Sequence, residues 1–268
     1  MTILETIVEK KKEEVTLAKA KTAVISLEET DNFRRECYRL KDFLTDTERT
    51  GIIAEFKRKS PSKGMLNNLA SVDQVTRGYA AAGASAVSVL TDTAFFDGFN
   101  RDLEEARKVN ELPVLRKDFT IDEYQIIEAK SLGADIILLI AAVLPPERVK
   151  VLARTAKDLG LNVLLEVHTR EELESSLCDE LDAVGVNNRN LADFTVRVDT
   201  SLELVSLIPD RYMKISESGI SSPETIRLLK DAGFNGFLIG ECFMKEKDPG
   251  AAMKSFTEEL KTLTQNNR

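Results

Sequence analysis

Tryptophan is absent from the 268-residue sequence, histidine occurs once, and cysteine occurs three times. The cysteines, Cys37, Cys178 and Cys242, are odd in number and far apart, which excludes a disulfide framework and fits a reducing compartment. One histidine and the lack of paired cysteines exclude a metal site built on imidazole or thiolate ligands. We therefore expect no metal and no cofactor, although a magnesium ion held by carboxylates would escape this test.

Long hydrophobic runs and an excess of positive charge are also missing. The N-terminus mixes Glu and Lys from Glu5 onward, so we expect neither a signal peptide nor a transmembrane helix and predict a cytoplasmic protein. The formal net charge is −8, and the lack of a basic arm argues against nucleic-acid binding. With 43% hydrophobic residues, the chain can bury a large core and needs no disulfide or structural metal for stability. The sequence does not indicate an oligomeric state.

From Gly51 onward, short apolar runs alternate with polar segments of helical periodicity. The runs are 51–56, 84–90, 113–116, 134–140, 162–167, 182–186, 212–216 and 236–240. Strands that are apolar throughout are buried on both faces, and helices between them imply parallel crossovers. Eight such units over residues 51–268 predict an α/β fold, a (βα)8 TIM barrel. The alternative is a doubly wound open sheet, but the Gly-rich dinucleotide turn that usually follows its first strand is not seen.

Helices are expected between these strands and before them. The ranges after Gly51 are 72–82, 101–110, 121–132, 145–159, 169–177, 202–207, 226–232 and a last helix after Asp248. Several end at Gly before the next strand, as C-caps do. We expect residues 1 to about 50 to form a helical extension that covers a surface of the barrel within one structural domain. Thr2 and Glu5 have the spacing of a capping box, and Ser26 and Glu29 repeat it.

The stretch 51–64 turns from an apolar run into a cationic loop. Side chains alternate across a strand, so Ile53, Glu55 and Lys57 share one face while Arg58 faces away. Four cations between positions 57 and 63 are a local exception in an acidic chain and favour an anionic small-molecule ligand. The alternative is a solvated basic loop. Glu55 and Lys57 would favour each other's charged form, either as reacting groups or as a structural ion pair.

Polar side chains end several of the expected strands, the first included, at the edge where a barrel of this type places its active site. They are Glu55, Lys57, Ser60, Lys117, Asp118, Glu166, Asn187, Asn188, Arg189, Glu217, Ser218 and Glu241. Charged residues at strand ends are common where a strand meets solvent, but this convergence predicts proton transfer on an anionic substrate, with Lys and Glu as acid and base. His168 reads as a loop residue. For Glu166, burial would raise the pKa and a nearby Lys would lower it, and the balance stays open.

Phosphate binding has its own signature in such barrels, in the loops after strands seven and eight. Ser218-Gly219 and Gly240-Glu241 stand at these positions. The alternative is that the two glycines only make tight turns.

These motifs, in this order, resemble the indole-3-glycerol-phosphate synthase family over nearly the whole chain. The most specific piece is residues 53–64, which looks like the family's signature. The supporting pieces are 88–92, 115–119, 134–140, 185–191, 217–220 and 238–241. The resemblance implies a phosphorylated substrate, 1-(2-carboxyphenylamino)-1-deoxyribulose 5-phosphate, converted to indole-3-glycerol phosphate with loss of CO2 and water.

The resemblance also implies roles for individual residues. Lys117 matches the general acid and Glu166 the proton acceptor, while Lys57 approaches the anionic groups of the substrate. Glu55 and Asn187 would be polar partners near the reacting atoms. The substrate would be bound by Ser60 and Arg189 at its anionic end, by Phe96 and Phe119 around its ring, and by Ser218, Gly219, Gly240 and Glu241 at its phosphate.

Three further expectations depend on this resemblance. Crowded cations are expected to lower the lysine pKa values toward the working range. Glu241 should offer only its backbone N–H to the phosphate, with its side chain turned away. The segment Asp97-Gly98-Phe99 departs from the family's usual Gly-Ser ending and puts the contacts of that loop in doubt.

Two alternatives stay open at this point. One is another phosphate-binding barrel, such as phosphoribosylanthranilate isomerase, which lacks the long helical extension and is expected to use a different acid/base pair. The other is a catalytically silent barrel that acts as a partner protein.

Overall fold

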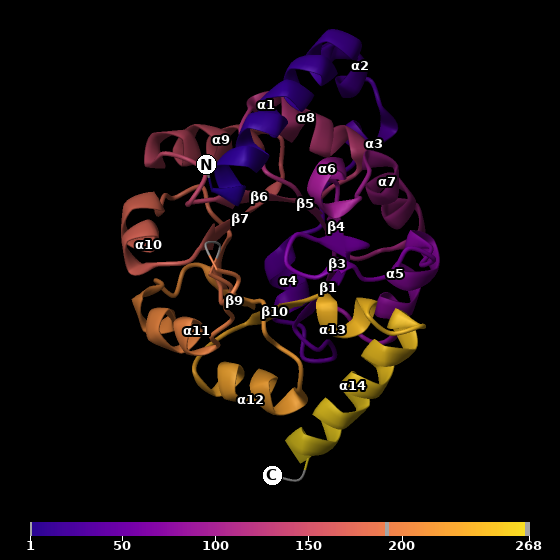
Figure 1. The fold of residues 1–268 in the computed structure, drawn as a ribbon, viewed down its shortest axis with the longest axis vertical. Helices are drawn as coiled ribbons and strands as arrows, with labels where there is room; N and C mark the ends of the chain where they lie inside the picture. Colours follow the sequence, from indigo (N-terminus) through magenta and orange to yellow (C-terminus); the bar gives the residue numbers. More distant parts are fainter. Residues whose placement is uncertain (1, 191–192, 266–268) are drawn as a thin grey trace.

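The computed structural model describes residues 2–190 and 193–265, so Leu191, which ends one of the resembling motifs, lies outside it. Eight parallel strands close into a barrel in the order β1-β10-β9-β8-β7-β6-β5-β4 (Figure 1). They are β1 (Ile52–Phe56), β4 (Ala86–Leu90), β5 (Val114–Lys117), β6 (Ile136–Ile140), β7 (Asn162–Val167), β8 (Ala183–Asn187), β9 (Met213–Glu217) and β10 (Gly236–Ile239). The predicted barrel is confirmed, and each predicted strand is found within two residues of its expected ends.

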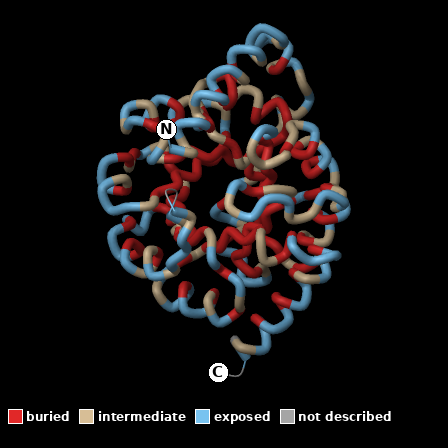
Figure 2. Tube along the Cα trace, in the orientation of Figure 1, coloured by how far each residue is buried: buried red, intermediate tan, exposed pale blue. Residues whose placement is uncertain are grey.

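Helices surround the barrel, and their outer faces are exposed while the strands are buried (Figure 2). They are α5 (Val72–Ala81), α7 (Asn100–Val109), α8 (Glu123–Leu132), α9 (Pro146–Asp158), α10 (Arg170–Ser176), α11 (Asp199–Leu204) with the 3-10 turn η1 (Val205–Leu207), α12 (Pro223–Asp231) and α14 (Pro249–Gln265). Gly133 ends α8 with φ +96, a left-handed C-cap that glycine adopts without steric cost. Within the described residues, no helix has both the length and the apolar character needed to cross a bilayer.

Inward-facing side chains fill the lower part of the barrel and form its own apolar cluster. Ile53, Leu115, Ile136 and Leu164 belong to it, one from each of four strands. The short helix α4 (Leu40–Leu44) adds Leu40 and Leu44 to the same cluster, so the segment before β1 contributes to the inside of the barrel. The interior of the barrel is a packed core, and a pocket opens near the carboxyl ends of the strands.

The N-terminal segment reaches the barrel mouth with its first helix. Helix α1 (Ile3–Lys21) begins with the predicted capping box of Thr2 and Glu5, which is confirmed. Helices α2 (Val24–Glu28) and α3 (Asp31–Arg34) follow and contact α8. The second predicted capping box is wrong, because Ser26 lies inside α2 and Ala23 precedes that helix.

Four short elements at the barrel mouth were not predicted. Strands β2 (Lys59–Ser60) and β3 (Gly64–Met65) form a hairpin in the cationic loop after β1. Helices α6 (Thr93–Phe96) and α13 (Glu241–Met244) follow β4 and β10. Each has two to four residues, too few for a hydrophobic period to be recognised in sequence.

Candidate active site

A pocket opens at the carboxyl ends of the strands, and it has two adjoining parts. One part is partly apolar and lies under α1, and the other lies between β1, β9 and β10. All thirteen predicted site residues line one or both parts: Glu55, Lys57, Ser60, Phe96, Lys117, Phe119, Glu166, Asn187, Arg189, Ser218, Gly219, Gly240 and Glu241. The structure therefore brings together, from seven strands and the loops that follow them, residues that are up to 186 positions apart in sequence, from Glu55 to Glu241.

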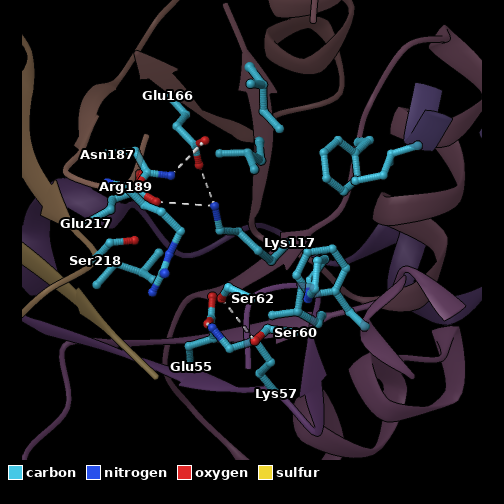
Figure 3. A pocket seen from close by; sticks show the side chains of 18 of the residues that line it. Glu55, Lys57, Ser60, Ser62, Lys117, Glu166, Asn187, Arg189, Glu217 and Ser218 are labelled. Carbon is cyan, nitrogen blue, oxygen red and sulfur yellow. Dashed lines mark hydrogen bonds and ion pairs between the residues drawn. The ribbon is translucent and has the colours of Figure 1, made fainter. Parts of the chain in front are cut away.

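Lys117 lies at the centre of the charged groups (Figure 3). Its Nζ is 2.6 Å from Glu166 Oε2 and 3.2 Å from Glu217 Oε2. The lysine at the end of β5 therefore contacts carboxylates from β7 and β9 inside the barrel. Asn187 Nδ2 donates to Glu166 Oε1 at 3.1 Å. Lys117 and Glu166 are thus held together by a charge-assisted hydrogen bond, with Asn187 fixing the second oxygen of the carboxylate.

Glu217 is a member of this cluster that the predicted site residues do not include. Its side chain is buried, and its register partner on β8 is Asn187. A Cβ at Gly185 would overlap Glu217 Oε1, so the missing side chain of that glycine makes room for the carboxylate. The position of Glu217 at the end of a predicted strand was the available signal. Its partner Lys117 is 100 residues away, and only the barrel geometry reveals the contact.

The buried charges shift one another's pKa values. Burial alone would lower the pKa of Lys117, but Glu166, Glu217 and Glu55 raise it above its ordinary value. Burial would raise the pKa of Glu166, yet Lys117 and His168 bring it down to about 2. Burial and Glu166 raise the pKa of Glu217 to about 7, against the effect of Lys117. The expectation that crowded cations lower the pKa of Lys117 is therefore wrong here, because carboxylates surround it.

Glu55 and Lys57 form a second ion pair on the same inner surface. Lys57 Nζ lies 2.6 Å from Glu55 Oε1, and both side chains border the pocket, as the strand alternation predicts. Arg58 faces the other way, pairs with Asp102 on α7, and lies over the ring of Phe56. The cationic loop thus sends Lys57 to the pocket and Arg58 to a structural contact.

The second part of the pocket is built from the loops after β9 and β10. Ser218 and Gly219 both have positive φ, +67 and +76, and so turn the backbone sharply beside the pocket. The prediction that the Glu241 side chain turns away is wrong. Its carboxylate accepts from Arg189 Nη2 at 3.3 Å and lies 3.8 Å from Lys63 Nζ, because both cations attract it into the pocket.

The apolar part of the pocket contains the two predicted aromatic residues. The rings of Phe96 and Phe119 lie 6.1 Å apart, centroid to centroid, with an interplanar angle of 39°. Ile3, Leu4 and Ile7 of α1 line the same part. This arrangement offers a flat apolar slot next to the charged cluster.

The loop that departs from the expected pattern is tightly constrained after Phe96. Asp97 is left-handed, with φ +54, and its carbonyl accepts from Arg58 Nη1 at 3.3 Å. A Cβ at Gly98 would overlap the carbonyl of Leu90. Phe96 therefore reaches the pocket from a loop that only glycine at position 98 allows.

Comparison with solved structures supports the fold. N-acetylmannosamine-6-phosphate 2-epimerase from Clostridium perfringens matches with a TM-score of 0.57 and 18% identity, covering 80% of this chain and 95% of that one. At this identity the likeness concerns the barrel alone.

Comparison of sequences is more specific. A model of the indole-3-glycerol phosphate synthase family matches residues 4–256. The chain is 45% identical to the indole-3-glycerol phosphate synthase of Bacteroides thetaiotaomicron, covering 96% of this chain and 98% of the relative. It is 44% identical to that of Laribacter hongkongensis, covering 94% and 97%. From the site and these matches together it follows that the chain belongs to the indole-3-glycerol phosphate synthase family.

Proposed function

We propose that Lys117 and Glu166 carry the acid and base steps of this carboxy-lyase of tryptophan biosynthesis, which makes indole-3-glycerol phosphate. The substrate is 1-(2-carboxyphenylamino)-1-deoxyribulose 5-phosphate, and CO2 and water are lost. The observation that carries the proposal is the 2.6 Å contact between Lys117 and Glu166 in a pocket with an aromatic slot on one side and a turn-rich loop on the other.

Substrate binding uses the two parts of the pocket for its two ends. The phosphate lies against the backbone of Ser218, Gly219, Gly240 and Glu241, and it competes with the Glu241 carboxylate for Arg189. The anthranilate ring lies between Phe96 and Phe119, whose rings favour a flat apolar partner. Ser60 and Lys57 face the anionic groups between the two ends. Both ends of the substrate are then held while its reacting carbon atoms meet near Lys117.

Ring closure follows from the charges of the buried pair. Lys117 Nζ gives a proton to the ribulose carbonyl oxygen as the aromatic carbon attacks the carbonyl carbon. A substrate inserted between Lys117 and Glu166 separates the pair, which lowers the pKa of the ammonium and raises that of the carboxylate. Both changes favour the reaction, because the ammonium becomes a better acid and the carboxylate a better base.

Aromatisation completes the reaction by loss of CO2 and then of water. Decarboxylation returns its electron pair to the benzene ring, and departure of the hydroxyl group as water, with loss of a proton from the neighbouring carbon, forms the aromatic pyrrole ring. Glu166 accepts the proton released in this dehydration, while Lys57 and Glu55 lie close enough to the substrate to assist the leaving hydroxyl. Asn187 holds the Glu166 carboxylate in position.

We also propose a cytoplasmic location, the compartment in which free thiols persist. Cys37, Cys178 and Cys242 are all free, and Cys178 is buried.

Incubation with the carboxyphenylamino-deoxyribulose phosphate tests the function directly. We expect indole fluorescence to develop with time and CO2 to be released in equal amount. If no fluorescence develops and the protein isomerises phosphoribosylanthranilate, the proposed function is wrong and the barrel is an isomerase.

A further inference from the structure

The chain's one histidine lies behind the proposed base, between two carboxylates. His168 directly follows β7, and its side chain is only 10% exposed. Its Nε2 is 3.4 Å from Glu166 Oε1, and its Nδ1 is 3.2 Å from Glu172 Oε2 on α10. The ring therefore bridges the active site and a neighbouring cavity of about 340 Å³ that Glu172 also lines.

Glu172 is held in this position by the backbone. The N–H of His168 donates to Glu172 Oε2 at 2.6 Å, and the N–H of Glu172 donates to Thr169 Oγ1 at 3.2 Å. The carboxylate is thus tied to the start of α10 and faces Nδ1 of the ring. A carboxylate oxygen only accepts hydrogen bonds when ionised, so Nδ1 must carry a proton.

The proton on Nδ1 decides what Nε2 presents to Glu166. In the neutral ring, a proton on Nδ1 leaves a bare lone pair on Nε2, which would point at the Glu166 carboxylate and repel it. In the imidazolium both nitrogens carry a proton, so each nitrogen faces its carboxylate as a donor. Nε2 is buried and forms no hydrogen bond within the described residues, although Glu166 Oε1 lies 3.4 Å away. The geometry therefore fits the doubly protonated ring.

Other charged groups near the ring come from several elements. They are Glu166 on β7, Glu172 on α10, Glu217 on β9, Lys117 on β5 beyond Glu166, and Arg189 and Arg197 on the far side of the cavity. Burial lowers the pKa of His168, but Glu172, Glu166 and Glu217 raise it above its ordinary value. The carboxylates thus outweigh burial.

We propose that His168, as an imidazolium clamped by Glu172, is a positioning residue that holds the Glu166 carboxylate for catalysis. The inference rests on the proposed role of Glu166 as the base. Lys117 is the partner of Glu166 Oε2 and leaves when the substrate enters, whereas His168 faces the other oxygen, Oε1, to which Asn187 also donates, and stays. The base then keeps its orientation after the ion pair with Lys117 has opened.

Proton NMR of the imidazole tests the clamp without any substrate, because the chain has one histidine and its two ring C–H signals need no assignment among several residues. We expect His168 to titrate above about 6.5, the ordinary histidine value. Glu172→Gln and Glu166→Gln should each lower that value by about one pH unit, as the loss of a close opposite charge does. Glu171→Gln is the matched control, since it removes one charge from the same turn of α10 at an exposed position and should leave the titration unchanged.

Turnover measured against pH tests the function of the clamp. We expect kcat to fall about tenfold as the pH rises through the His168 value found by NMR, and Glu172→Gln to move this fall to lower pH together with the NMR titration. His168→Gln, which keeps a donor but no charge, should lack this fall and turn over about tenfold more slowly at low pH. A difference of that size corresponds to one pKa unit.

The outcomes separate the clamp from a structural role and from the proposed function. A ring that titrates at the ordinary value, or a Glu172→Gln profile identical to that of Glu171→Gln, overturns the clamp. So does His168→Gln with the wild-type pH profile and the same loss at every pH, which indicates packing alone. If the wild-type protein turns over no substrate, the proposed function fails, while the NMR titration still decides the protonation of His168.

Discussion

Lys117 Nζ and Glu166 Oε2 lie 2.6 Å apart inside the barrel, so the proposed acid and base neutralise each other's charge. The contact spans β5 and β7, which are neighbours only through β6. Both groups are buried, and a buried pair left without one member carries an uncompensated charge. Each half of the pair can therefore be tested by replacing it with a neutral side chain of similar length.

Lys117→Met should abolish most of the activity. The variant keeps the length of the side chain and removes the proton that the ribulose carbonyl requires, so kcat should fall by at least about 10²–10⁴-fold. Two buried carboxylates then lose their cation, and one takes up a proton at neutral pH. Indole fluorescence measures the rate, and circular dichroism checks the fold. A kcat near the wild-type value would remove Lys117 from the mechanism.

Glu166→Gln tests the base with the smallest change of shape. The amide still accepts from Asn187 or Lys117 but cannot take up the released proton, so kcat should fall about 10²–10⁴-fold with little change in KM. Glu171→Gln, at an exposed position of α10, is the control for loss of one negative charge and should behave as wild type. Equal rates for the two variants would show that another group accepts the proton.

Glu217→Gln should change how stability depends on pH. Glu166 and Glu217 share Lys117 and titrate as a coupled pair, in which the pKa of Glu217 is raised to about 7 from its ordinary value of 4.5. Between these two pH values the folded state binds more protons than the unfolded chain, so the free energy of unfolding falls as pH rises. This contribution is fully present below pH 4.5 and is lost as pH rises through about 7.

In Glu217→Gln this group does not titrate, so its contribution to the free energy of unfolding does not fall with pH. The stability of the variant relative to wild type should therefore rise between pH 5 and pH 8, by up to about 1.4 kcal/mol for each pH unit in the window. Thermal unfolding at several pH values measures it, and about 2–4 °C in Tm corresponds to 1 kcal/mol for a chain of this size. Parallel Tm curves for variant and wild type would mean that Glu217 is ionised throughout.

The fold was predictable because its signals are local. Most strands contain a short apolar run, as β6 does with Ile136–Ile140, and Gly133 closes α8 just before β6 begins. The capping box at Thr2 and Glu5 is likewise a contact over three residues. The same spacing at Ser26 and Glu29 gave a wrong prediction, because Ser26 lies inside α2 and not at the position before its first residue.

The site was predictable as a set of strand ends but not as a set of contacts. Glu217 stands at a strand end like Glu166, and its contact with Lys117 depends on barrel closure and on the space left by Gly185. Glu241 was expected to turn away from a phosphate, but two cations draw it inward. His168 looks like a loop residue because its partner Glu172 lies on the next helix and its other partner lies inside the barrel.

Gly240→Ala should disturb the second ion pair rather than the first. A Cβ at this position would lie 2.6 Å from Glu55 Oε1 and 3.0 Å from Glu55 Cβ, so the Glu55 side chain must move and Lys57 with it. We expect a higher KM and a kcat reduced about tenfold or more, since small misplacements are costly in catalysis. Gly160→Ala, with nothing within 4 Å and far from the pocket, should affect stability alone.

Lys11→Met tests how α1 is held over the apolar part of the pocket. Lys11 is buried, and its Nζ lies 2.8 Å from Asp92 Oδ2 and 2.9 Å from Asp118 Oδ1, in the loops after β4 and β5. Removing the cation leaves two buried carboxylates, a change that costs about 3–5 kcal/mol in comparable pairs. Helix α1 should detach before the barrel unfolds, because the contacts near its other end are with the start of α8 at the outside of the barrel, where Lys19 pairs with Asp122 and Tyr124 Oη donates to the Ala18 carbonyl.

Detachment of α1 has two measurable consequences. Amide exchange within Ile3–Lys21 should accelerate, and KM should rise because Ile3, Leu4 and Ile7 leave the slot for the aromatic ring. Lys10→Met is the matched control, since Lys10 is half-exposed and pairs with Glu13 on the same helix, a contact that contributes little to stability. Unchanged exchange in Lys11→Met would mean that apolar packing alone holds the helix, and the same KM in both variants would place α1 outside substrate binding.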